Sequence, residues 1–501
     1  MSFSDNHFNG ITIPSVWKSG RNVVDSQTQT QDIETIEKGI SVISCNQMET
    51  QTMGPIDSHK TRPLKTFDSP ELTRFVSKAS EITIDLIRKS KDKQIIDRIE
   101  KYQNQSKANV SMICKFYKHL DPMPNDKQID YCVSAVSWNS NASVLAVGHK
   151  ARAHTDWCTH SSFIHFWSLF KASKSEEPSI ELEIDGCVAS LMSHPTQPYI
   201  YFSGAFNGKI SVWNTRNSDD PLIASEVGHQ TAVSHIHWIQ SEKRPDFGQI
   251  VSSGFDGKVL VWKMSDKGLQ LEKAFVVLAQ DMPKSMQIKR DSIEVGITSM
   301  SFNCDDPNIF LIGCIGGPLF QCSLLNEKPI LNKNVWISEK YKNFEVKSPI
   351  VMTYASHRSH INTVEFSPVS RNTFFSISSD NELRVYNILQ TLPLLVIHTE
   401  VPLVSGKWSP SRPNIAGVGT DGRIYVYSIT DTKVSKASLI FSIGDQINAK
   451  YLVYNTIENN EQMAVIASNN QIQVWDLSDA SQKTDNKTVS NILNRLTNDE
   501  N

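Results

Sequence analysis

Histidine and aspartate side chains are the groups in this chain best suited to acid–base chemistry. His154, Thr155, Asp156 and Trp157 are consecutive and form the most suggestive polar cluster. A histidine beside a carboxylate can act as a general base. The sequence holds no G-x-S-x-G, H-E-x-x-H or glycine-rich phosphate-loop motif to complete an active site. We therefore interpret the cluster as a loop hydrogen-bond network, and we predict no catalytic residue and no cofactor.

Two further histidines occupy positions where strand repeats often carry a structural histidine. His229 lies in VGHQ and His360 in RSHI. Asp256 and Asp380, each in a later turn, are plausible partners for them. We predict that these pairs stabilise the fold and do not perform chemistry.

The eight cysteines are scattered, with no C-x-x-C pair and no histidine at the usual zinc spacing. We predict free thiols in a reducing compartment and no metal site. The chain begins without a basic, apolar export signal and contains no long apolar run, so neither export nor membrane insertion is predicted. A net charge of -3 over 501 residues gives no reason to expect nucleic acid as a partner. We expect a cytoplasmic protein.

Two Thr-Gln-Thr segments lie in the polar leader, residues 1–66. They are Thr28-Gln29-Thr30, within SQTQTQ, and Thr50-Gln51-Thr52, within METQTM. In an extended chain the two threonines of a segment share one face, so each segment could add as a strand to a partner's sheet edge. A dimeric partner would gain from two copies by effective concentration. The register of the first segment is ambiguous by two residues, because such a shift keeps the same face.

The leader has little apolar surface from residue 18 to residue 66 and is predicted to be disordered when alone. One apolar island, ITIPSVWK, contains Trp17. This residue is a possible docking anchor, since aromatic side chains dominate interface energetics.

Asp68-Ser69-Pro70 predicts the start of an amphipathic helix within residues 67–104. A break could occur near residues 89–93. The apolar residues follow helical i, i+3, i+4 spacing, and this stripe needs a cover, either this chain's own domain or another subunit. The residues are Leu72, Phe75, Val76, Ala79, Ile82, Leu86 and Ile87.

A repeated unit dominates residues 129–479: a tight-turn dipeptide followed by an alternating strand that closes, in most copies, on an aromatic residue. The seven copies end at Trp167, Trp213, Trp262, Cys322, Tyr386, Tyr427 and Trp475. Asn-Gly and Asp-Gly supply the positive φ of tight hairpins. An apolar strand, a turn and a second apolar strand precede each copy. The spacing of 41 to 64 residues predicts an all-β protein, a seven-bladed WD40-type β-propeller with insertions in the middle.

Three other segments do not follow this repeat. Residues 105–128 form a linker or a closing strand, with SMICKFYK (111–118) as the candidate strand and a short helix as the alternative. Residues 265–296 form a charge-rich insert that we interpret as a solvated loop, with a partner surface as the alternative. Residues 480–501 form a polar tail.

Together these motifs resemble the intermediate chains of dynein motors, most closely those of cytoplasmic dynein-2. The resemblance rests on IPSVW, the TQT segments, SPELTRFV, SAVSWNSNASVLAVG with HTDW, HPTQP, DGKVLVW and EVGITSMSFNCDDPNIFLIGCIGG. It implies a non-catalytic motor subunit. The propeller would bind the heavy-chain tail beside a second, paralogous intermediate chain. The TQT segments would bind a dimeric light chain, and the helix would bind a roadblock-type light chain. The implied role is retrograde intraflagellar transport and cilium assembly, with localisation in the cytoplasm, the cytoskeleton and the cilium.

The alternatives are an intermediate chain of dynein-1 or of an axonemal dynein, or a generic WD40 scaffold. A dynein-1 chain would open with a long charged coiled coil, and residues 1–66 contain no heptads. A generic scaffold would not need tandem TQT segments and an amphipathic helix.

Overall fold

A computed structural model describes most of the strand-rich region and one helix. The described residues are 70–90, 110–117 and 130–477, the last range with gaps at 154–157, 170–176, 241–247, 266–267, 284–285, 287–293, 327, 331–336, 338, 342–343, 430–433, 435, 445–446 and 456–460. The chain divides into two compact units, Met1–Leu86 and Ile87–Asn501, which we describe separately.

The helix α1 extends over Pro70–Ser90. Pro70 is its first residue, where the missing N–H of proline has no partner within a helix to lose. The predicted helix is therefore confirmed from Pro70 to Ser90. Residues 91–104, over which it could have continued, lie outside the described residues.

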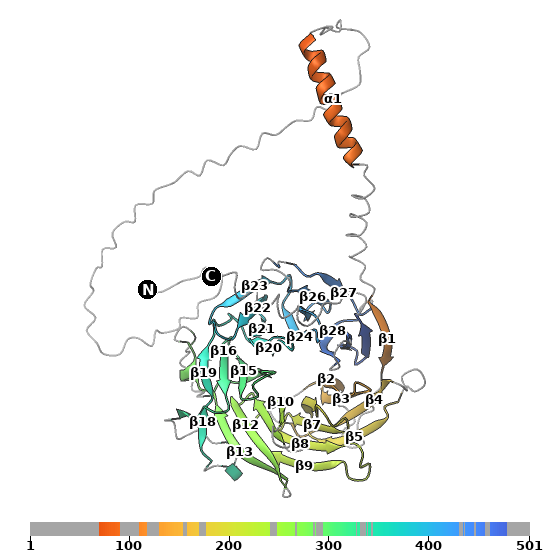
Figure 1. Cartoon of the computed structure of the whole chain (residues 1–501). Coiled ribbons are helices and arrows are strands. Elements are labelled where there is room, and N and C mark those ends of the chain that lie inside the picture. Colours follow the sequence, from red (N-terminus) through yellow and green to blue (C-terminus); the bar gives the residue numbers. More distant parts are fainter. Residues whose placement is uncertain are drawn as a thin grey trace, which may run out of the picture. The chain divides into compact units, whose positions relative to one another are not determined.

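The strands form seven blades, each with a four-stranded antiparallel sheet, and one blade carries two extra strands. This arrangement confirms the predicted seven-bladed propeller, and Figure 1 shows the blades in a ring. Blades one to three comprise β2 (Tyr131–Trp138), β3 (Val144–Ala151), β4 (Ser161–Ser168), β5 (Ile180–Asp185); β6 (Val188–Ser193), β7 (Ile200–Ala205), β8 (Lys209–Asn214), β9 (Leu222–Val227); and β10 (Val233–Gln240), β11 (Gly248–Gly254), β12 (Lys258–Ser265), β13 (Gly268–Val276).

Blades four to seven follow the same pattern. They comprise β14 (Ile297–Phe302), β15 (Ile309–Cys314), β16 (Leu319–Ser323), β19 (Ile350–Thr353); β20 (Ile361–Phe366), β21 (Thr373–Ser378), β22 (Glu382–Asn387), β23 (Pro393–His398); β24 (Leu403–Trp408), β25 (Asn414–Gly419), β26 (Ile424–Ser428), β27 (Leu439–Phe441); and β28 (Ala449–Tyr454), β29 (Gln462–Ala467), β30 (Ile472–Asp476), β1 (Ser111–Phe116).

The seven sequence repeats supply the third strand of each blade: β4, β8, β12, β16, β22, β26 and β30. The turns before these strands contain the positive φ angles that the dipeptides predicted, at Gly208, Gly257, Gly422, Asn381 and Asn470. At Gly208 a Cβ would stand 1.9 Å from the carbonyl oxygen of His229. Both its φ of 76° and this close approach therefore require glycine.

The first strands of the blades converge on a central channel. Residues from all seven of these strands line it, among them Ser134, Ser190, His235, Ser299 and Asn362. Each first strand also has a register shift near its start against the second strand. Such bulges increase local twist, which suits sheets that radiate from an axis.

The ring is closed by an N-terminal strand, and the expected closing strand is present. β1 pairs antiparallel with β30, so Met112 lies opposite Trp475. Phe116 at the end of β1 is buried, with its ring centroid 5.1 Å from that of Trp167 in blade one. Strands far apart in the sequence thus complete blade seven and join it to blade one.

The two long spacings in the middle of the chain each contain an insert. The insert between β13 and β14 includes the 3-10 turn Ala279–Asp281. The insert after β16 includes the 3-10 turn Glu339–Tyr341 and turns back to blade three, where β17 (Lys328–Pro329) pairs with β18 (Val346–Ser348), and β18 runs parallel to β13. The interpretation of 265–296 as a solvated loop was wrong at its start. Leu269 and Phe275 are buried because β13 is the outer strand of blade three.

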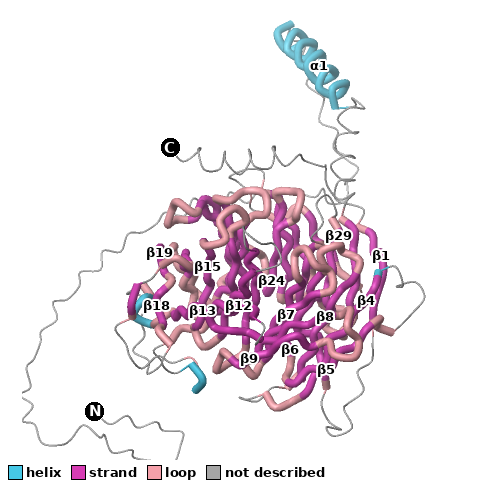
Figure 2. The backbone as a smooth tube through the Cα atoms, turned by 60° about the horizontal axis from the view of Figure 1, so that its bottom comes forward, coloured by secondary structure: helices cyan, strands magenta, loops and turns pink. Residues whose placement is uncertain are grey.

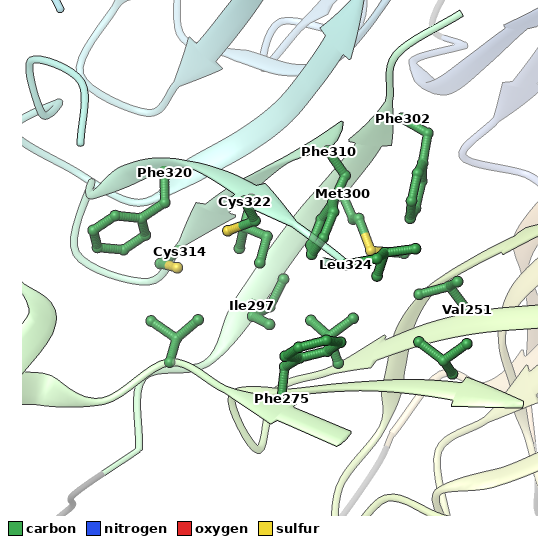
Figure 3. Packing of buried hydrophobic residues seen from close by; sticks show 14 of the residues in the cluster. Val251, Phe275, Ile297, Met300, Phe302, Phe310, Cys314, Phe320, Cys322 and Leu324 are labelled. Atoms are coloured by element: carbon green, nitrogen blue, oxygen red, sulfur yellow. The ribbon is translucent and has the colours of Figure 1, made fainter. Parts of the chain in front are cut away.

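The core lies between neighbouring blades, which pack face to face. Figure 3 shows one such layer, in which Phe275 of blade three faces Ile297 and Phe310 of blade four. Because both faces of a blade are covered, β7 and β21 are buried at every residue. The tube view in Figure 2 shows the ring tilted, with the strands of the blades running across its thickness.

Among the described residues, no helix has the length and apolar character needed to cross a membrane.

Candidate functional site

The apolar stripe of α1 is the predicted binding surface that the structure describes. At 100° per residue, its seven positions fall within an arc of about 140° on one side of the helix. Leu72, Phe75, Val76 and Ile82 are exposed, and Ala79 is half-buried. Leu86 and Ile87 belong to the helix, but their side chains lie outside the described residues. The helix thus brings the predicted residues onto one face.

The other side of α1 carries mostly polar residues. Arg74 and Glu81 are exposed there, together with one apolar residue, Ile84, which is 49% exposed. Phe75 is 69% exposed and Ile82 is 59% exposed. An exposed apolar stripe opposite a charged face is typical of a helix that docks in a groove of a partner.

The other predicted partner-binding residues cannot be placed. Thr28, Gln29, Thr30, Thr50, Gln51, Thr52 and Trp17 lie outside the described residues. So does the polar cluster at 154–157, in the connection between β3 and β4.

Blade three contains a buried polar network around His229. Its Nδ1 lies 3.0 Å from Asp256 Oδ1, and its Nε2 lies 2.8 Å from Ser252 Oγ. Trp262 donates its indole N–H to the same Ser252 oxygen at 3.0 Å. The residue types match a hydrolase triad. However, Ser252 is fully buried and its oxygen already accepts a bond, so the network stabilises the blade.

Asp256 carries the negative charge of this network. Burial alone would raise its pKa, but the charge and hydrogen bond of His229, together with nearby Lys258, lower the pKa to about 2. Lys258 is itself buried, with Nζ 3.6 Å from Asp256 and 3.4 Å from Glu294. The predicted pair of His229 with Asp256 is therefore confirmed.

The predicted pair of His360 with Asp380 was wrong, because His357 takes that place. His357 Nδ1 lies 3.0 Å from Asp380 Oδ2, and its Nε2 lies 2.7 Å from Ser376 Oγ. His357 stands four residues before the first residue of β20, as His229 stands four residues before β10. His360 instead contacts Ser379 Oγ at 2.9 Å. In both blades the histidine that pairs with the aspartate is the one four residues before the first strand. The histidine directly before that strand, His360, does not pair with the aspartate.

The structure also brings together a cluster that the sequence did not predict. Cys158 and His160 precede β4, and Cys187 lies between β5 and β6. Their ligand atoms lie within 4.8 Å of one another. A hydrogen bond with Cys187 lowers the pKa of the Cys158 thiol to about 5, and the same contact and burial raise that of Cys187. No short motif contains all three residues, so only the fold reveals the cluster.

The fold defines a WD40-type β-propeller protein. The family model "WD domain, G-beta repeat" matches residues 221–263, which cover β9 to β12 of blades two and three.

The chain is also similar to several dynein intermediate chains. "Cytoplasmic dynein 2 intermediate chain 2" of Mus musculus is 26% identical over 94% of this chain and 88% of its own length. The protein of the same name in Homo sapiens is 27% identical over 83% of this chain and 78% of its own. "Cytoplasmic dynein 1 intermediate chain" of Drosophila melanogaster is 21% identical over 66% of this chain and 49% of its own. The resemblance to dynein intermediate chains, most closely to the dynein-2 type, is thereby confirmed.

Proposed function

We propose that this chain is the non-catalytic intermediate chain of a cytoplasmic dynein-2 motor. The observation that carries the proposal is the extent of similarity. The mouse dynein-2 chain matches 94% of this chain, whereas the dynein-1 chain of Drosophila melanogaster matches 66% and the axonemal chain of Rattus norvegicus matches 65%. The dynein-2 similarity therefore includes sequence beyond a shared propeller.

In this proposal the propeller, residues 129–479, binds the tail of the dynein-2 heavy chain beside a second, paralogous intermediate chain. Closure of the ring by β1 gives each blade four strands. A closed ring leaves few exposed sheet edges and offers a stiff platform for a long partner.

The segments before the propeller recruit light chains. The helix within residues 67–104 binds a roadblock-type light chain through its apolar stripe. Support comes from the exposure of Phe75, Val76 and Ile82. Burial of large apolar side chains against a partner contributes favourable free energy in proportion to the area removed from water. The leader, residues 1–66, binds a dimeric light chain through its two TQT segments, which would add as strands to that partner.

The proposed role is retrograde intraflagellar transport and cilium assembly, in the cytoplasm, on the cytoskeleton and in the cilium. The chain would contribute binding and no catalysis. Support for this view comes from the His229–Asp256–Ser252 network, whose side chains pack inside blade three and away from solvent.

Live imaging of tagged transport particles tests this role. Removal of the chain from a ciliated cell should stop particle movement from the tip to the base, so that cargo accumulates at the tip. Re-expression of the chain should restore the movement. Normal retrograde movement without the chain would contradict the dynein-2 role, and loss of ciliary beating with normal transport would favour an axonemal dynein.

A further inference from the structure

Cys158, His160 and Cys187 form a compact sulfur–nitrogen cluster at the junction of blades one and two. Cys158 and His160 come from the end of the connection between β3 and β4. Cys187 comes from the short connection between β5 and β6. Cys158 Sγ lies 3.9 Å from His160 Nδ1, and all three ligand atoms lie within 4.8 Å of one another.

Backbone N–H groups point at both sulfur atoms of the cluster. The backbone N–H of Ala151 points at Cys187 Sγ at 3.2 Å, and that of Cys187 points at Cys158 Sγ at 3.3 Å. Hydrogen bonds from N–H groups stabilise negative charge on a ligand atom and fix its direction. The two cysteines are 4% and 0% exposed, whereas His160 is half-buried. The cluster is therefore buried at its two sulfur atoms and partly exposed at its histidine.

Another pair of cysteines shows what an ordinary core position looks like. Cys314 and Cys322 in blade four are fully buried and pack in an apolar cluster with Phe310 and Phe320 (Figure 3). Cys158 and Cys187 also pack in a small apolar cluster, with Ala151 and Phe206, but they receive backbone N–H groups and adjoin a histidine as well. Core packing explains the blade-four pair, but it does not explain why a histidine joins the second pair.

We propose that Cys158, Cys187 and His160 bind a zinc ion. Two thiolates and an imidazole are ligands that zinc prefers, at about 2.3 Å for sulfur and about 2.0 Å for nitrogen. In a tetrahedral site such ligand atoms lie roughly 3.5–4 Å apart, so the cluster needs only a small contraction to close on the ion. Solvent takes the fourth position. Zinc binding requires both sulfur atoms as thiolates, so any proton still bound to them is released to water and the site loses zinc as the pH falls.

Zinc bound at this site would link the residues just before β4 in blade one to the connection between β5 and β6, which leads into blade two. The inference does not depend on the dynein role, because it concerns the chain itself. The test uses the full chain, purified without a histidine tag, chelator or metal column, in the presence of a non-chelating reductant. Bound zinc is measured by inductively coupled plasma mass spectrometry.

We expect about one zinc ion per chain, lost in Cys158→Ser and in Cys187→Ser. Cys304→Ser is the matched control, because Cys304 is exposed in another blade. Replacement of zinc by Co²⁺ in the unmodified chain should give a thiolate-to-cobalt charge-transfer band. This second readout requires no variant and so does not depend on whether the substituted chains fold.

Three results would overturn the proposal. The first is a reduced chain that neither contains zinc nor gives the cobalt band. The second is metal binding that Cys304→Ser removes as effectively as Cys158→Ser. The third is a Cys158–Cys187 disulfide in protein alkylated directly from cells, which would make the pair a redox site.

Discussion

Phe75 provides the sharpest test of the proposed light-chain site. Its side chain is 69% exposed. Since a whole phenylalanine buries about 150–250 Å², a partner that covers it removes roughly 100–170 Å² from water. At about 25 cal/mol per Å², and allowing for the Cβ that alanine keeps, Phe75→Ala should weaken binding by about 2–4 kcal/mol. The dissociation constant should therefore rise by roughly 30- to 1,000-fold.

Isothermal titration calorimetry of the full chain with a roadblock-type light-chain dimer measures this effect. Alanine is a better helix former than phenylalanine, so a loss of affinity cannot be assigned to a weaker helix. Arg74→Ala is the matched control on the polar side of α1, and its affinity should change by no more than about twofold. Thermal unfolding of the propeller should be the same in both variants.

Equal affinity of Phe75→Ala and the unmodified chain would refute the docking of this stripe. A similar loss in Arg74→Ala would also refute it, because the site would then not be confined to the apolar face. The double substitution of Phe75 and Ile82 by aspartate should release the light chain completely, since an unpaired carboxylate is costly to bury.

Three other predictions concern the leader and the propeller. Alanine substitution of residues 28–30 and 50–52 together should remove the TQT-binding light chain in a pull-down without changing the propeller's melting temperature, and retention of that light chain would exclude both segments. Asp256→Ala should lower the free energy of unfolding by about 3–5 kcal/mol, because it leaves buried Lys258 and His229 without their carboxylate; denaturant titration should show a smaller loss for the more exposed Asp421→Ala. The pKa of Asp256 is lowered from 3.8 to about 2, so its stabilisation is complete above about pH 5 and is lost as the pH falls toward 2. Between pH 5 and pH 3 the unmodified chain should lose about 1 kcal/mol more than Asp256→Asn does, and an identical pH slope would show that this carboxylate is not held ionised.

The repeated strands could be predicted from sequence because their signals are local. Each Asn-Gly or Asp-Gly turn supplies a positive φ. The apolar and polar residues alternate along the strand that follows it, and this pattern is visible within a few neighbouring residues of the sequence. The amphipathic stripe of α1 is local in the same sense. Even the degenerate repeat ending at Cys322 was found, because its Gly316-Gly317 turn keeps the pattern.

Features that depend on distant contacts were less accessible. The choice between His357 and His360 depends on where β20 starts, which the sequence alone does not give. The return of the segment before β19 to blade three creates β17 and β18 from a stretch without a strong strand pattern. The cluster of Cys158, His160 and Cys187 exists only because two connections meet at the junction of two blades.

The measurement that tests the proposed identity most directly is affinity purification of the tagged chain from ciliated cells, followed by mass spectrometry. We expect a dynein-2 heavy chain, a second intermediate chain and light chains in the purified complex. Dynactin together with a dynein-1 heavy chain would contradict the dynein-2 proposal in favour of dynein-1. Recovery of no dynein heavy chain would contradict a motor role and leave a WD40 scaffold.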